Sequence, residues 1–145
     1  MNASCLAACV VMVLSKWGVA VAEAEARRVL KTKPYSGTQA VNLLRLGELG
    51  FDAWPQEGSV AELRRRVGGG APLIVFLWTG PLRREGDTDD VDYLHTVVVV
   101  GWTEKIVWVH DPALPSGPTE VAWDKFVAAW GFSRQMMAMI EPHRE

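Results

Sequence analysis

The sequence predicts an α+β domain in which N-terminal helices pack on a C-terminal antiparallel sheet. Two observations support this fold class. Up to about residue 70, apolar residues recur with helical spacing between capping residues and glycines. From residue 72 onward they form short, continuous runs rich in Val and Ile, which are typical of buried strands. Helices followed by a group of strands indicate an α+β arrangement.

Length and composition predict one globular domain over residues 1–145. The chain has 49% hydrophobic residues and seven tryptophans, enough to fill a single core. Its formal net charge of -2 produces no field that would attract nucleic acid, and no apolar run reaches the roughly 18 residues of a membrane span. We therefore expect neither a nucleic-acid partner nor membrane insertion.

The two cysteines are four positions apart on one expected helix, which suits a disulfide poorly. They indicate a reducing compartment, so we expect a cytoplasmic protein. Leu6-Ala7-Ala8-Cys9 resembles a lipoprotein cleavage box, but neither a basic segment nor a long apolar run precedes it. We therefore do not interpret it as a processing site.

A helix is expected from Ser4 to Trp17, with Gly18 as its stop and Cys5 in its first turn. Unpaired backbone N–H groups and the positive end of the helix dipole meet at such a position and favour the thiolate form of a cysteine. The simpler interpretation is that Cys5 and Cys9 are small apolar residues of a hydrophobic helix.

Three further helices are expected in the first half. They cover 22–31, 38–48 with an apolar stripe of Val41, Leu44 and Leu49, and a segment that begins after the capping box of Ser59 and Glu62 and ends at 68–70. Strands are expected at 51–54, 72–78, 96–102, 106–109, 119–122 and 135–140, with a short helix at 124–130. Because 97–100 is apolar at every position, this strand should be covered on both faces, one of them by the Cys5 helix.

His95 and Asp111 are the other candidates for chemistry. His95 opens the Val-rich strand directly after a polar loop, and Asp111 follows the next strand and precedes a proline. Each has a simple alternative interpretation: an edge histidine with satisfied hydrogen bonds, and a carboxylate that begins a turn.

The loop between these two strands decides whether the two residues meet. If 103–105 form a three-residue loop, Val97 faces Asp111, and facing residues point to the same side of the sheet. His95 shares that side because side chains alternate along a strand, so Asp111 would be its diagonal neighbour. A two-residue turn at 104–105 would shift the register by one and send Asp111 to the opposite face.

A thiol at a helix start, a histidine that can take its proton and a carboxylate that orients the histidine are the parts of nucleophilic catalysis on acyl groups. The chain resembles the bacteriocin-processing cysteine peptidases, the double-glycine leader peptidase family with its stand-alone relatives. The resemblance extends from about Ser4 to Ile140. It is carried by Cys-Leu-Ala-Ala-Cys-Val-Val-Met at 5–12, Trp-Gly at 17–18, and later blocks at 37–38, 49–51, 71–74, 95–101 and 109–112.

This resemblance implies a papain-like fold in which Cys5 is the nucleophile, His95 the general base and acid, and Asp111 the orienting carboxylate. It implies a peptide or leader-peptide substrate and an association with a transporter or larger assembly. The implied thiol chemistry requires no cofactor. Cys9 aligns with a family cysteine that is not the nucleophile.

Two departures from the family pattern concern the oxyanion site. Leu6 stands where the family has Gly, and the family's Gln about six residues before the nucleophile falls outside the sequence given. We consider three explanations: a truncated start, substitution by Asn2 as oxyanion donor, or a domain with impaired activity.

Other candidate sites are weaker. The acidic loop with Asp87, Asp89, Asp90 and Asp92 is typical of a solvated loop, and the cysteines and histidines lack zinc-site spacing. His143 is expected to be solvated. The leading hypothesis is therefore a thiol hydrolase or acyltransferase acting on a peptide. The alternatives are a catalytically degenerate domain that only binds a leader peptide, and a purely structural domain.

Overall fold

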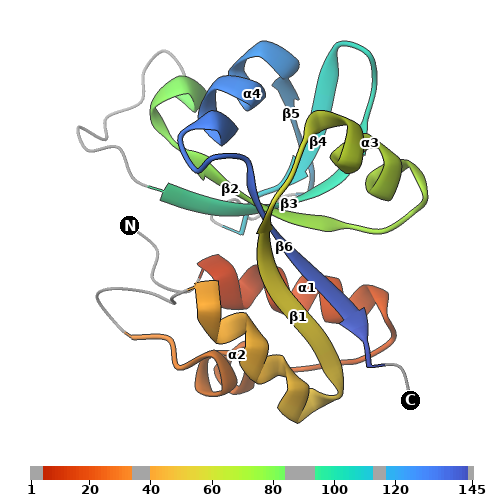
Figure 1. Cartoon of the computed structure of the whole chain (residues 1–145), viewed down its shortest axis with the longest axis vertical. Helices are drawn as coiled ribbons and strands as arrows, with labels where there is room; N and C mark the ends of the chain where they lie inside the picture. Colours follow the sequence, from red (N-terminus) through yellow and green to blue (C-terminus); the bar gives the residue numbers. More distant parts are fainter. Residues whose placement is uncertain (1–4, 34–39, 84–93, 113–116, 144–145) are drawn as a thin grey trace.

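One six-stranded antiparallel sheet organises the protein in the computed structural model, which describes residues 5–33, 40–83, 94–112 and 117–143. The strand order is β1-β6-β2-β3-β4-β5, so the C-terminal strand lies between the first two (Figure 1). The strands are β1 (Phe51–Glu57), β2 (Leu73–Trp78), β3 (Leu94–Trp102), β4 (Ile106–His110), β5 (Thr119–Ala122) and β6 (Met136–Pro142).

Helices cover the sheet from two sides (Figure 1). One group is α1 (Cys5–Lys16), α2 (Glu23–Leu30) and the 3-10 helix η1 (Ala40–Leu49), and the other is α3 (Val60–Gly68) and α4 (Trp123–Gly131). A further 3-10 turn, η2 (Gly80–Leu82), follows β2. Side chains of β2 alternate between two cores: Ile74 and Phe76 join the α1 side, whereas Val75 and Leu77 join the α4 side.

The predicted α+β class is confirmed, and the expected helices and strands occur in the expected order. Ser59 caps α3 as predicted, because its Oγ accepts the backbone N–H of Glu62 at 3.1 Å. Glu62 does not complete the expected capping box. Its carboxylate instead pairs with Arg65 and Arg66. Among the described residues, no helix has both the length and the apolar character needed to cross a membrane.

The apolar stripe predicted for the third helix is wrong at Val41 and Leu44, whereas Leu49 packs against the core as expected. This segment is a 3-10 helix, in which residues three apart lie on one side, so Leu43 and Leu46 are buried. Val41 and Leu44 are 56% and 61% exposed. The expectation assumed the 3.6-residue period of an α-helix, which places a different set of side chains inward.

The β3–β4 hairpin differs from the expected loop. Thr103 N–H donates to Ile106 O at 2.8 Å, which leaves a two-residue turn. Such a turn alone would move Asp111 to the wrong face, but the register shifts between Val99 and Gly101. Val100 is the extra residue of this β-bulge. It is 44% exposed, so the expectation that 97–100 is covered on both faces fails at that residue.

Hydrogen bonds join the residue after β6, His143, to the start of β1. The His143 N–H donates to Gly50 O at 2.9 Å, and His143 Nδ1 lies 3.0 Å from Asp52 Oδ1. The His143 side chain is 62% exposed, as expected of a solvated residue, but it has a defined partner.

Candidate active site

Cys5 is the first residue of α1 and is only 6% exposed. The helix is apolar around most of its circumference because it lies between the sheet and α2. Its first four N–H groups have no acceptor within the helix, so the sulfur sits where backbone dipoles favour negative charge. The fold therefore holds a thiol at the positive end of a buried helix.

His95 is the second residue of β3, is 4% exposed, and directs its Nδ1 to Cys5 Sγ at 3.2 Å. Cys9, one turn into α1, donates its thiol hydrogen to Thr96 O at 3.4 Å. This bond fixes α1 against β3 directly beside His95. The helix and the strand therefore hold the sulfur and the imidazole together.

Asp111 follows the last residue of β4, and its Oδ1 lies 2.6 Å from His95 Nε2. The bulge at Val100 explains this contact. Beyond it Val98 faces His110, and the same register places Asp111 opposite Val97, on the side of the sheet that His95 shares. The predicted proximity therefore occurs, but through a two-residue turn and a bulge rather than a three-residue loop.

Electrostatics make the His95 ring cationic at neutral pH. Burial lowers the pKa of His95, but hydrogen bonds to Asp111 and then to Cys5, with the charges of both groups, outweigh it and raise this pKa to about 9. A protonated ring donates from both nitrogens, so Asp111 and the Cys5 sulfur both act as acceptors. A thiolate accepts such a bond better than a thiol does.

The second thiol has the opposite character. Burial raises the pKa of Cys9 well above its ordinary value, and the neighbouring Cys5 and Asp111 raise it further. Cys9 therefore remains a thiol and acts as a hydrogen-bond donor within the core. Only Cys5 combines a helix start with a cationic partner, which are the conditions that activate a sulfur nucleophile.

The sequence profile of the peptidase C39 family matches residues 1–144, almost the whole chain. The chain belongs to the peptidase C39 family. Among curated proteins no significant match is found.

Solved structures of C39 peptidases share the fold. A C39-like peptidase from Bacillus anthracis has a TM-score of 0.76 at 19% identity, covering 99% of this chain and 91% of its own. The peptidase domain of Streptococcus ComA, a bi-functional ABC transporter involved in quorum sensing, has a TM-score of 0.74 at 20% identity, with 97% and 92% covered. A double glycine motif protease from an AMS/PCAT transporter, in complex with the leader peptide, has a TM-score of 0.72 at 19% identity. The match covers 98% of this chain and 86% of that protease.

The C39 fold brings Cys5, His95 and Asp111 into one hydrogen-bonded row. Asn2 lies outside the described residues, as does the acidic loop with Asp87, Asp89, Asp90 and Asp92. In the part of the chain that the structure describes, no group of three His, Cys, Asp or Glu side chains could hold a metal ion. Cys9, expected only as an apolar residue of the helix, also bonds to β3, and its i+4 spacing from Cys5 places it on the same side of the helix.

Proposed function

We propose that this chain is a cysteine peptidase in which Cys5 is the nucleophile, His95 is the general acid and base, and Asp111 orients and stabilises the imidazolium. Two distances support this assignment: 3.2 Å from Cys5 Sγ to His95 Nδ1, and 2.6 Å from His95 Nε2 to Asp111 Oδ1. Both lie within the range expected for a nucleophile, its base and the orienting group.

The reaction would proceed through a thioester. The Cys5 thiolate attacks the carbonyl carbon of a peptide bond, and N–H groups at the start of α1 stabilise the oxyanion. His95 then gives its Nδ1 proton to the departing amine as the carbon–nitrogen bond breaks. Neutral His95 next takes a proton from water, whose oxygen attacks the thioester, and the acid product leaves as the Cys5 thiolate is restored.

A leader peptide is the proposed substrate class, with cleavage after small residues. Membership of the C39 family supports this, as do structural neighbours that include a double glycine motif protease with its leader peptide and the peptidase domain of a transporter. A transporter is accordingly the proposed larger assembly. The two cysteines are free, which supports a reducing compartment, and the proposed location is the cytoplasm.

Selective alkylation tests the assignment of the nucleophile. Iodoacetamide at neutral pH, followed by peptide mass spectrometry, should label Cys5 and leave Cys9 unlabelled, and this selectivity should disappear in denaturant. Equal labelling of both thiols in the folded protein would contradict the proposal.

Turnover provides the second test. Peptides with two glycines before the cleaved bond should be hydrolysed by the wild type and by Cys9→Ser, which keeps a hydrogen-bond donor to Thr96 O, but not by Cys5→Ala. A folded wild type that binds such peptides without cleaving them would favour a degenerate peptide-binding domain.

A further inference from the structure

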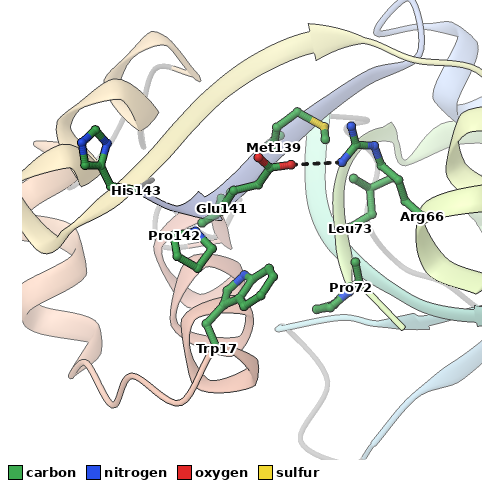
Figure 2. A pocket seen from close by; sticks show the side chains of 11 residues that line it. Trp17, Arg66, Pro72, Leu73, Met139, Glu141, Pro142 and His143 are labelled. Carbon is green, nitrogen blue, oxygen red and sulfur yellow. Dashed lines mark ion pairs between the residues drawn. The ribbon is translucent and has the colours of Figure 1, made fainter. Parts of the chain in front are cut away.

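Figure 2 shows a cavity of about 330 Å³. It lies beside Trp17, at the opposite end of α1 from the Cys5 thiol. Trp17, just after the helix, forms part of its wall, together with residues that precede β2 and residues that end β6. Because α1 spans 12 residues, this cavity is about 18 Å from Cys5 along the helix. The proposed catalytic chemistry makes no use of it.

A proline explains why the sheet opens there. Ile74 of β2 faces Ala138 of β6, so continuing the ladder would bring Pro72 opposite Ile140. Proline has no N–H and cannot donate to the Ile140 carbonyl. The N–H of His143 points toward β1, where it donates to Gly50 O. Backbone groups of successive residues in a strand point to opposite edges, and Ile140 lies three residues before His143. The Ile140 carbonyl therefore points away from β1, toward the gap.

Two opposite charges face each other across the mouth of this gap. Arg66 of α3 and Glu141 of β6 form an ion pair of 3.5 Å, with side chains 25% and 41% exposed (Figure 2). The contact with Glu141 is long and partly exposed and therefore weak. A shorter bond of 2.6 Å from Arg66 Nε to Glu62 holds the guanidinium at this position. Arg66 and Glu141 thus offer one cationic donor and one anionic acceptor, complementary to the carbonyl and the N–H of a peptide group.

An apolar wall completes the cavity. The Trp17 side chain lies below the Glu141–Arg66 pair with Pro72 and Pro142 on either side (Figure 2). Trp17 is 43% exposed although it is the type of residue that folding tends to bury. Tryptophan is enriched at binding interfaces because its ring combines a large apolar surface with an N–H donor.

We propose that this cavity binds a short extended segment of a partner polypeptide, which extends the sheet where Pro72 ends it. The segment donates a backbone N–H to the Ile140 carbonyl, exchanges polar contacts with Arg66 and Glu141, and packs an apolar side chain on Trp17. Such strand addition combines backbone hydrogen bonds for affinity with a side-chain pocket for specificity.

The occupant is distinct from the peptide that the proposed active site would cleave. Buried residues run along α1 from Cys5 to Leu14, so the helix and its packing separate the two sites. A peptide joining them would have to pass around the surface of the domain. Binding at the cavity is therefore expected to persist when the catalytic thiol is removed.

Nuclear magnetic resonance with a defined peptide tests this site. The probe is acetyl-Thr-Val-Trp-Val-Thr-amide, added to the full chain carrying Cys5→Ala so that no cleavage occurs. We expect saturable shifts at the Trp17 indole N–H and at the Ile140 and Glu141 amides, and none at His95. Two N-methylated versions, one at the central Trp and one at both Val residues, should differ, because alternate N–H groups of a strand point to opposite edges. One should bind at least tenfold more weakly.

Matched variants separate the cavity from general aromatic stickiness. Trp17→Ala should weaken binding at least tenfold, whereas Phe132→Ala, which removes a 66% exposed ring outside the cavity, should leave it unchanged. Equal binding of both N-methylated peptides, shifts centred on His95, or no saturable shifts with the parent peptide would each overturn the proposal. None of these results depends on whether the chain is an active peptidase.

Discussion

His95 is the residue on which the candidate site depends, because it joins two groups that are distant in the sequence. Cys5 is 90 positions away and Asp111 is 16 positions away, yet both reach one buried ring. Burial alone would lower the pKa of His95, and its hydrogen bonds to Asp111 and then to Cys5, with the charges of both groups, raise it to about 9. Removing either one should change the chemistry more than it changes the fold.

Asp111→Asn tests the orienting carboxylate. The amide can still hold the His95 ring, but it no longer stabilises the imidazolium, so kcat/KM for peptide hydrolysis should fall roughly 100- to 10,000-fold. Circular dichroism should show a folded protein. Asp52→Asn is the matched control, because Asp52 also contacts a histidine but on the surface, and its turnover should equal that of the wild type. Unchanged turnover in Asp111→Asn would exclude the triad role.

The pH dependence of turnover tests the protonated form of His95. Above about pH 9 the ring loses its proton, so the acid that protonates the departing amine disappears and kcat/KM for peptides should decline. Iodoacetamide alkylation of Cys5 needs no general acid and should not decline in that range. If both rates fall together above pH 9, the loss reflects unfolding rather than deprotonation of His95.

At the level of elements, local periodicity predicted the sheet and most helices, but not the details that set the site. The predicted α+β class and strand order along the chain follow from runs of Val and Ile with clear turn signals. The bulge at Val100 has no such signal, because an extra residue in an apolar run has the same pattern as a regular strand. The proximity of His95 and Asp111 was therefore predicted correctly from the sequence, but with a three-residue loop in place of the two-residue turn and bulge.

The buried side of the 3-10 helix η1 was predicted wrongly for a related reason. Ala40, Leu43, Leu46 and Leu49 form a stripe with a period of three, while Val41 and Leu44 also fit an α-helical stripe. With apolar residues at both sets of positions, the sequence alone could not choose. Contact with β1 and α2 selects the set that is buried.

Alanine substitutions distinguish these two stripes. Leu46→Ala removes a fully buried side chain and should lower the free energy of unfolding by about 2 to 5 kcal/mol. Leu44→Ala, the matched change on the exposed side of η1, should cost less than about 0.5 kcal/mol. Urea denaturation measures both. A larger loss for Leu44→Ala would show that the segment buries the α-helical stripe instead.

For the whole molecule, one sheet supports both the candidate active site and the proposed binding cavity. Its central strands β2 and β3 are covered on both sides, which fixes α1 and with it the thiol. At one end of that helix lies the candidate active site, and at the other end the sheet opens at Pro72. The sequence predicted the first, because thiol chemistry uses recognisable residues. It could not predict the second, because a cavity depends on which strands become neighbours.

The stability of the whole domain should depend on pH through His95. The pKa of this ring is about 9 in the folded protein and about 6.5 when unfolded. Its contribution is therefore complete below pH 6.5 and is lost as the pH rises through 9, a difference of about 3 kcal/mol. Urea denaturation at pH 6 and pH 9.5 should show the wild type losing more stability than His95→Gln, which cannot titrate. Comparing each protein with itself removes the constant cost of the substitution. Equal losses in the two proteins would mean that the His95 charge is not stabilised by its neighbours, which would also remove the electrostatic basis of the proposed catalytic pair.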